Sequence, residues 1–288
     1  MWAIEGTGGY GAGLTRFLQA HTEQVVELDR PKRAARRHGA KSDALDAIRA
    51  AREALGRDQL AQPRAAGHRA ALSVRPAARR SAVQATTDAQ RQLHALVVAA
   101  PDTLRSRLRD LTTPRLVSIC GRLRLRADTD PETAATAASL RALARRIQLL
   151  DAEIVDHTRA ITALVRAWHP ELLAPTGVGP IVAAVVSCAW SHPGRCRTDA
   201  AFAMLGGAAP IPASSGQQVR VRPNRSGDRQ PNQALHLVVL TRLRHDPATR
   251  AYAQRRRAEG KTNREIRRCL VRYVARQLYR LLETQPAL

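Results

Sequence analysis

The chain has 288 residues, of which 47 are Lys or Arg and 24 are Asp or Glu, so its net charge is +23. Its hydrophobic fraction of 44% is too high for a disordered polycation, and we expect a folded protein whose partner is an anion. No apolar run reaches the roughly 20 residues that span a bilayer, and the first residues carry no export signal. These features exclude a membrane protein and predict a cytoplasmic one.

The four cysteines are scattered along the chain, at Cys120, Cys188, Cys196 and Cys269. Because none of them forms a CxxC pair, neither a zinc site nor a disulfide framework is indicated. We expect reduced and mostly buried thiols.

The first part of the chain, residues 1–60, has the pattern of a small α/β domain. Trp2–Glu5 and Gln24–Leu28 are typical of short strands. The apolar face of the helix expected between them comprises Leu14, Phe17 and Leu18. This order of elements predicts a βαβ unit.

A basic segment leads into a second predicted helix. Residues 30–41 include six basic residues and no acidic one, and Ser42 then stands where an N-cap is expected before the Ala-rich helix Asp43–Leu55. Asp43 and Asp46 lie three residues apart in the first turn of that helix, so both are on one face. Two carboxylates placed in this way can share a divalent cation.

The position of Glu5 favours a metal site over a simpler explanation of the two aspartates. The helix dipole favours Asp in any first helical turn, which would account for a lone DxxD pair. Glu5, however, comes at the carboxyl end of a predicted strand, where the sites of α/β domains assemble. Three carboxylates beside a basic segment predict a Mg²⁺ site that handles phosphodiesters.

The middle of the chain is expected to be a linker followed by long helices. Pro63, Gly67 and Pro76 interrupt helical periodicity and predict a linker over 61–81. The region 82–167 is expected to form an α-helical coiled-coil region, as an antiparallel hairpin or as a dimerising stalk. The coiled-coil seam is expected at Leu140, Leu143, Ile147, Leu150, Ile154, His157, Ile161 and Leu164, whose spacing alternates between three and four residues.

The last region, residues 168–288, is expected to be mostly helical and to bind nucleic acid. Residues 201–288 contain 17 basic and five acidic residues, a net charge of +12, and each phosphate that they neutralise would release a counterion. Gly177 and Gly179 could form the hairpin of a helix-hairpin-helix element, whose backbone N–H groups bind a phosphate. A plain turn explains these two glycines about as well.

A loop rich in Gly, Pro and Ser carries a candidate nucleophile. Ser214 and Ser215 lie in this loop, and phosphoryl transfer by a serine requires an exposed hydroxyl with cations nearby. The candidate cations are Arg220, Arg222, Arg225 and Arg229. A flexible surface turn would explain the loop equally well on spacing alone.

Taken together, these segments resemble the DEDD-type transposases of bacterial insertion sequences over nearly the whole chain. The segments that carry the resemblance are Glu5-Gly6-Thr7-Gly8-Gly9-Tyr10-Gly11, Lys41-Ser42-Asp43-Ala44-Leu45-Asp46-Ala47, Thr176-Gly177-Val178-Gly179-Pro180, and Ser214-Ser215-Gly216 followed by Asn224-Arg225-Ser226-Gly227-Asp228. The resemblance implies an N-terminal RuvC-like domain with a ribonuclease-H fold, a coiled-coil middle and a C-terminal transposase domain with a catalytic serine. It also implies an RNA-guided recombinase.

The resemblance assigns roles to particular residues. It implies that Glu5, Asp43 and Asp46 are catalytic carboxylates that bind Mg²⁺, and that Ser215 rather than Ser214 is the nucleophile. The family's first Asp lies well upstream of its Glu, whereas only four residues precede Glu5 here. The resemblance therefore implies an N-terminally truncated chain with three of the four DEDD carboxylates.

These observations lead to a first hypothesis and two rivals. The first is a Mg²⁺-dependent DNA transposase that binds the element ends, the target DNA and a guide RNA, and that assembles as a homo-oligomer. The second is a truncated, non-catalytic nucleic-acid-binding relic of such an enzyme. The third is a structural DNA-bridging protein that dimerises through the heptads. Mg²⁺-dependent strand exchange with a covalent DNA adduct would distinguish the first from the other two.

Overall fold

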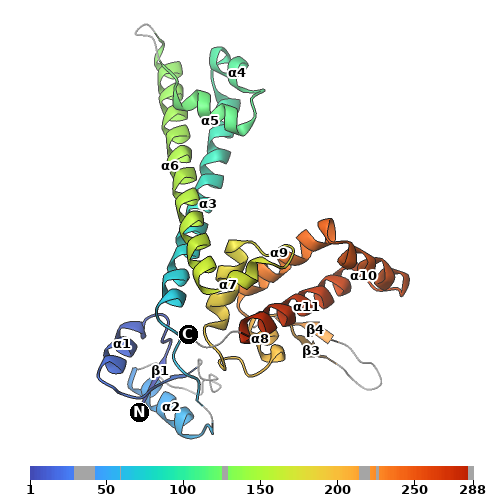
Figure 1. The fold of residues 1–288 in the computed structure, drawn as a ribbon. Helices are drawn as coiled ribbons and strands as arrows, with labels where there is room; N and C mark the ends of the chain where they lie inside the picture. Colours follow the sequence, from blue (N-terminus) through green and yellow to red (C-terminus); the bar gives the residue numbers. More distant parts are fainter. Residues whose placement is uncertain (29–42, 59, 125–128, 214–220, 225–226, 285–288) are drawn as a thin grey trace. The chain divides into compact units, whose positions relative to one another are not determined.

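The computed structural model describes residues 1–288 except 29–42, 59, 125–128, 214–220, 225–226 and 285–288 (Figure 1). The chain forms two compact units, one made of Leu72–Trp168 and the other of Met1–Ala71 together with His169–Leu288. Within the described residues the chain is mainly helical and contains two small two-stranded sheets. This confirms the mixed, mainly α class expected from the sequence.

The N-terminal segment contains the predicted βαβ unit. Strand β1 (Trp2–Glu5) pairs in parallel with β2 (Val25–Leu28), and helix α1 (Ala12–Ala20) connects them. Helix α2 (Asp43–Leu55) packs against β1. A two-stranded sheet is too small to identify the ribonuclease-H-like fold, which stays a prediction.

The apolar face predicted for α1 is partly wrong. Leu18 is buried, but Leu14 and Phe17 are 50% and 60% exposed. The spacing of apolar residues indicates that a helix has a face, but burial also requires a neighbouring element to cover the whole of that face.

The described part of the middle unit contains four helices. Helices α3 (His68–Ala99) and α6 (Pro131–Trp168) run side by side in opposite directions, and α4 (Asp102–Leu108) and α5 (Thr113–Gly121) lie at one end of the pair (Figure 1). A side-chain hydrogen bond links the two long helices: Arg79 Nε of α3 donates to Thr158 Oγ1 of α6 over 2.7 Å. The sequence left open a hairpin within one chain or a dimerising stalk, and the described helices form a hairpin.

The expected interruption of helical structure over 61–81 is wrong for its second half. Helix α3 begins directly after Gly67, which adopts φ +60°, and continues through Pro76. A proline inside a helix removes one backbone hydrogen bond and costs about 3 kcal/mol. Leu72, one turn before the proline, is fully buried, and such packing offsets this cost.

The seam predicted on α6 is covered by the chain's own helices over part of its length. Leu140 and Ile147 are fully buried in a cluster with apolar residues of α3, α4 and α5, among them Leu93 and Leu116. Ile161 is also fully buried, while Ile154 and His157 are only partly buried. The regular a/d spacing therefore predicted helix burial correctly at these positions, whereas the coiled-coil geometry and self-association stay predictions.

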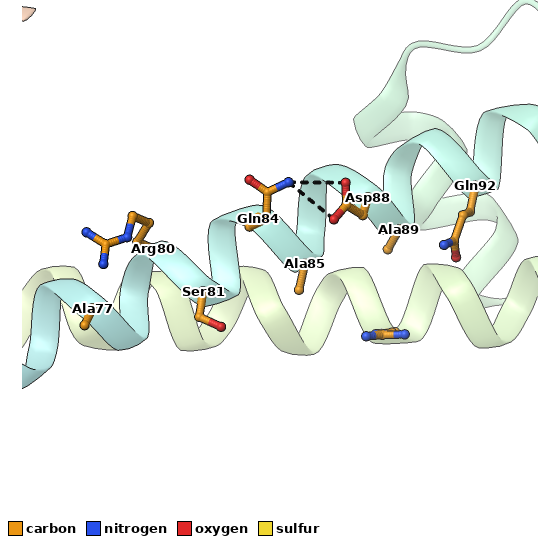
Figure 2. A pocket seen from close by; sticks show the side chains of 9 residues that line it. Ala77, Arg80, Ser81, Gln84, Ala85, Asp88, Ala89 and Gln92 are labelled. Carbon is orange, nitrogen blue, oxygen red and sulfur yellow. Dashed lines mark hydrogen bonds between the residues drawn. The ribbon is translucent and has the colours of Figure 1, made fainter. Parts of the chain in front are cut away.

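A groove of about 640 Å³ lies between the two long helices of this unit (Figure 2). Eight of its nine lining residues belong to α3, and the ninth is Arg146 of α6. Three alanines and several polar side chains of α3 form its floor, and Gln84 Nε2 donates to the Asp88 carboxylate. The groove exists because small side chains on α3 leave space beside α6.

The C-terminal region is a group of packed helices with one short hairpin. Its elements are the 3₁₀ helix η1 (Pro170–Leu173), α7 (Pro180–Trp190), α8 (Asp199–Leu205), β3 (Pro210–Pro212), β4 (Val221–Pro223), α9 (Arg229–His245), α10 (Pro247–Ala258) and α11 (Asn263–Glu283). Helix α11 packs against α7, α8, α9 and α10, and its buried stripe includes Val274 and Leu278. The mostly helical character expected for residues 168–288 is thus confirmed within the described residues. None of the described helices combines the length and the apolar character needed to cross a membrane.

Candidate catalytic site and nucleic-acid interface

The three predicted carboxylates come from two elements that touch. Glu5 ends β1, where it is paired with Leu28, and Asp43 and Asp46 occupy the first turn of α2, which packs against β1. All three residues are exposed, and Asp46 forms an ion pair with Arg49 over 3.6 Å. The structure therefore brings together the strand and the helix that carry these residues.

The donor set suits Mg²⁺, but the described side chains are not arranged around a metal ion. Carboxylate oxygens are the ligands that Mg²⁺ prefers in proteins. Within the described parts of the chain, no group of three His, Cys, Asp or Glu residues is placed so that it could hold a metal ion. The site formed by Glu5, Asp43 and Asp46 stays a prediction, and no catalytic step is derived through it.

The candidate nucleophile falls, in the sequence, between two short paired strands. Strands β3 and β4 pair antiparallel, with Pro212 opposite Val221, and the segment between them contains Ser214 and Ser215. Ser214, Ser215, Arg220 and Arg225 fall outside the described residues. Of the other predicted cations, Arg222 lies in β4 and Arg229 begins α9, and both are exposed.

A close contact between two backbone segments joins α8 to the residues that follow β4. A Cβ atom on Gly227 would lie 2.3 Å from Gly207 N and 2.4 Å from Gly207 Cα, so no side chain fits there. Gly207 adopts φ +65°, a conformation that favours glycine. Both glycines are therefore required by the way the two segments meet.

Polar side chains strengthen the same contact. Asn224 Nδ2 donates to Met204 O over 2.9 Å, and Asn232 Nδ2 donates to Gly206 O over the same distance. Asp228 donates its backbone N–H to Leu205 O and caps α9 by accepting from Gln230 N. We call Asn224, Gly227, Asp228 and Asn232, with residues 204–207, the loop clamp. Sequence reasoning quoted part of this motif but missed its structural role, because the contact joins residues about twenty positions apart.

The predicted glycine hairpin has a clear packing role. Gly177 adopts φ +86°, and a Cβ there would lie 3.1 Å from Val238 O of α9. Arg242 of α9 donates from Nε to Thr176 O over 2.8 Å, which holds the turn in place. Gly179, the N-cap position of α7, is exposed and has open space around it. Phosphate binding by Gly177 and Gly179 stays a prediction.

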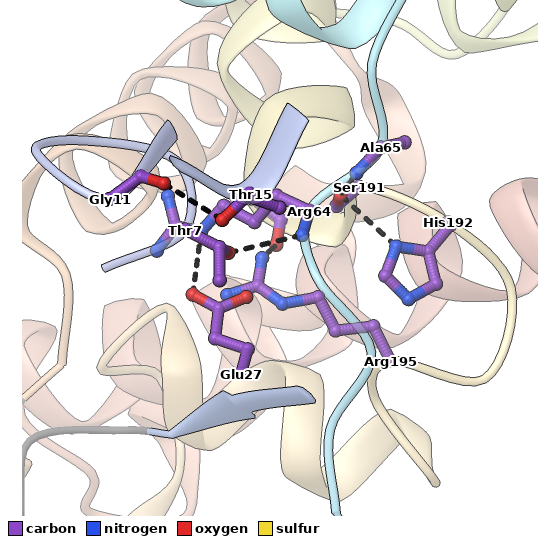
Figure 3. Close-up of polar contacts among 10 residues, drawn as sticks. Thr7, Gly11, Thr15, Glu27, Arg64, Ala65, Ser191, His192 and Arg195 are labelled. Carbon is purple, nitrogen blue, oxygen red and sulfur yellow. Dashed lines mark hydrogen bonds and ion pairs between the residues drawn. The ribbon is translucent and has the colours of Figure 1, made fainter. Parts of the chain in front are cut away.

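A buried charged cluster, which sequence reasoning missed, joins the N-terminal segment to the C-terminal helices (Figure 3). Glu27 of β2 is 5% exposed and lies 3.4 Å from Arg64 Nε. Arg69 is 6% exposed, and burial together with the nearby Arg64 guanidinium lowers its pKa. Arg64 and Arg69 lie against the backbone of Gly8, where a Cβ atom would be 2.6 Å from Arg64 Cδ and 3.3 Å from Arg69 Nη1.

Hydrogen bonds extend this cluster to the loop after α7. Arg64 N donates to Thr7 Oγ1, and Ala65 N donates to Ser191 Oγ over 3.1 Å (Figure 3). Ser191 is buried and adopts φ +72°. Burial raises the pKa of the nearby Cys188 thiol to about 11, so this cysteine is an unreactive packing group. The segment 64–69 thus connects the βαβ unit to the C-terminal helices.

Comparison with known proteins assigns both ends of the chain. Residues 1–100 match the protein-family model of the DEDD transposases of the IS110 type, which is described as Transposase. Residues 170–254 match a second family model, described as Transposase IS116/IS110/IS902 family. The first match contains Glu5, Asp43 and Asp46, and the second contains Gly177, Ser215 and the loop clamp.

Two curated proteins are similar to about half of the chain. An insertion element IS110 uncharacterized 43.6 kDa protein of Streptomyces coelicolor is 32% identical over 149 residues, which is 51% of this chain and 35% of that protein. An insertion element IS900 uncharacterized 42 kDa protein of Mycobacterium paratuberculosis is 31% identical over 144 residues, 49% of this chain and 36% of that protein. The match thus spans about a third of each relative. With both family domains in the expected order, the chain belongs to the IS110/IS900 family of DEDD transposases, the proteins of mobile insertion sequences.

Proposed function

We propose that the protein cleaves and exchanges DNA strands at the ends of an insertion sequence, with Ser215 as the nucleophile. The observation that carries the proposal is the order of the two family matches, since the carboxylates fall in the first and the serine loop in the second. In the reaction, Ser215 Oγ attacks a DNA phosphorus and forms a phosphoserine bond. The P–O bond to the neighbouring nucleotide breaks, and its oxygen leaves as a hydroxyl.

The proposal gives the other predicted residues defined tasks. Glu5, Asp43 and Asp46 would hold Mg²⁺, which when bound neutralises charge on the phosphodiester. Arg222 and Arg229 would bind phosphates beside the serine loop, together with Arg220 and Arg225. The loop clamp would hold the base of the hairpin in place, so that the serine is presented from a rigid support.

The proposed partners are DNA, in the form of element ends and target, a guide RNA encoded by the element, and further copies of the chain. What supports nucleic acid is the charge of residues 201–288, a net +12 from 17 basic and five acidic residues. A guide RNA and a homo-oligomer are proposed from the resemblance alone.

The test is a covalent adduct between the protein and labelled DNA. The chain is incubated with Mg²⁺, DNA that carries an element end and the RNA transcribed from the element, and denaturing gels then detect protein-linked label. Ser215→Ala is expected to abolish the adduct, because a methyl group cannot attack phosphorus. Ser214→Ala and Ser226→Ala serve as matched controls and are expected to retain adduct, and chelation of Mg²⁺ is expected to remove it.

Two results would contradict the proposal. Adducts that persist in Ser215→Ala would exclude this serine as the nucleophile. A chain that binds DNA and RNA but never forms an adduct would instead support the non-catalytic, nucleic-acid-binding alternative.

A further inference from the structure

A second hollow lies on helix α11, outside the serine loop and the predicted carboxylates. It has a volume of about 380 Å³, which falls in the range of roughly 300 to 1,000 Å³ typical of ligand pockets. Its lining residues are Tyr273, Arg276, Gln277, Arg280, Leu281 and Thr284. One aromatic ring, two guanidinium groups and an amide therefore line one open hollow on this helix, which we call the Tyr273 pocket.

The ring of Tyr273 is exposed and yet held in a fixed orientation. It is 52% exposed, and its centroid lies 5.8 Å from that of Tyr252 of α10 at an interplanar angle of 82°. The Arg255 guanidinium lies 5.5 Å from the centroid of the Tyr252 ring. Burial and a hydrogen bond with Tyr273 raise the pKa of Tyr252 to about 12. An exposed aromatic ring that packs against a second ring is a suitable platform for stacking.

The pocket also carries excess positive charge. Arg276 Nε bonds to Asp199 Oδ2 over 2.6 Å, and Arg280 approaches the same carboxylate at 3.9 Å. One carboxylate thus faces two guanidinium groups, and the Arg280 side chain is 70% exposed. An anion that enters the pocket would therefore meet a cation that is largely open to solvent.

The amide of Gln277 completes the set of groups. Its Oε1 accepts from Arg242 Nη1 over 2.9 Å. With the oxygen held in this way, the NH₂ group of Gln277 is the part of the amide that can donate to a ligand. The pocket thus combines a stacking surface, a cation and a hydrogen-bond donor.

We propose that the Tyr273 pocket binds one unpaired nucleotide of a DNA or RNA strand. Its base stacks on Tyr273, its phosphate binds Arg280, and an acceptor on the base edge receives the Gln277 NH₂ group. In a duplex, neighbouring bases stack on both faces of a base and its pairing edge is occupied, so the pocket selects unpaired strands. Stacking tolerates any base. This inference rests on the proposed function, because it takes nucleic acid to be the partner.

The test measures binding of full-length chain variants to a fluorescent single strand and to the matching duplex, in separate DNA and RNA series. Tyr273→Leu is expected to weaken single-strand binding about ten-fold, and duplex binding less than two-fold. Tyr273→Phe keeps the ring and is expected to bind like the original chain. Tyr10→Leu makes the same change at a fully exposed tyrosine outside the pocket and is the matched control. The DNA and RNA series identify which strand the pocket prefers.

A crosslinking experiment supplies a second readout. A strand that contains 5-iodouracil is irradiated with the protein, and the crosslinked peptide is expected to include Tyr273. The proposal is overturned if Tyr273→Leu binds single strands normally, if it loses duplex binding equally, or if crosslinks map elsewhere. If instead the original chain binds neither strands nor duplexes, the proposed function fails together with the pocket.

Discussion

Gly227 is the residue whose replacement has the most direct structural consequence. A Cβ there would overlap backbone atoms of Gly207, and backbone cannot move aside as a side chain can. We expect Gly227→Ala to destabilise the protein by roughly 3 kcal/mol and to reduce adduct formation although Ser215 is unchanged. Urea unfolding followed by circular dichroism measures the first effect.

The control for this variant is Gly13→Ala. Gly13 lies in helix α1 with nothing within 4 Å of an added Cβ, and alanine is the better helix former there. Stability should therefore stay equal or rise slightly. Equal stability of Gly227→Ala and the unchanged chain would show that the loop clamp does not form.

Glu27 illustrates the cost of leaving buried charge without its partner. Glu27→Gln removes the carboxylate that faces Arg64 and contributes to the surroundings of Arg69. We expect a loss of about 3 kcal/mol, because Arg69, which is 6% exposed, then loses a nearby compensating carboxylate. Asp88→Asn, which breaks an exposed pair with Arg91, should change stability by less than about 1 kcal/mol. Similar thermal midpoints for the two variants would contradict this account.

Asp246 gives a stability contribution that depends on pH. It caps helix α10, and hydrogen bonds from the Thr249 side chain and backbone lower its pKa below the ordinary 3.8. Because the folded-state pKa is depressed, the contribution is present above the ordinary value and is lost as pH falls through the folded-state pKa. Asp246→Ala should cost about 1 kcal/mol at neutral pH and little in strong acid. If the difference in unfolding free energy between the original chain and Asp246→Ala stays constant down to about pH 2, Asp246 does not act as this cap.

At the scale of elements, two nearby apolar residues of helix α6 differ strongly in burial, and this difference can be tested. Ile147 is fully buried among α3, α4 and α5, whereas Leu149 is 74% exposed. Ile147→Ala is expected to cost about 3 kcal/mol through the cavity it leaves, and Leu149→Ala less than about 0.5 kcal/mol. Urea titration of both variants checks this, and light scattering tests whether either change alters the mass of the assembly. Equal costs would place the seam somewhere other than in the hairpin.

The elements that local sequence signals define were predictable. Trp2–Glu5 forms a strand and Asp43–Leu55 a helix with the expected bounds, because β-branched residues and N-terminal helix signals act within a few positions. The interruption predicted at Pro76 is wrong, because a helix can continue through a proline when the turns on either side of it are well packed. The exposure of Phe17 could not be predicted either, because it depends on whether another element covers that face of α1.

The sequence suggests residue types for a candidate site, and these assignments stay predictions, but it does not reveal the contacts that support the surrounding backbone. Carboxylates, a serine loop and arginines stand out by composition and spacing. The Gly207–Gly227 contact, the Arg69 cluster and the pairing of Tyr252 with Tyr273 join residues distant in the sequence. No periodicity within one element encodes such contacts, so only the assembled fold shows them.

At the scale of the whole molecule, the net charge of +23 should control affinity for nucleic acid. Each phosphate that an arginine neutralises releases a counterion, so affinity falls with salt in proportion to the number of contacts. For about four contacts, raising salt from roughly 50 to 200 mM should weaken binding about a hundred-fold. Fluorescence anisotropy with labelled duplexes at several salt concentrations measures this slope.

The position of the charges should matter as well as their number. Arg222→Glu with Arg229→Glu changes two exposed residues beside the serine loop, and Arg107→Glu with Arg109→Glu changes two exposed residues in or next to α4 of the middle unit. Both pairs alter the net charge equally, so a general attraction would weaken binding by the same factor. If nucleic acid binds at a defined interface near the loop, the Arg222→Glu and Arg229→Glu variant should weaken binding more than the other variant. The dependence of its affinity on salt should also decrease by the equivalent of about two phosphate contacts. Equal losses from the two pairs would mean that nucleic acid is held by the overall field rather than at this surface.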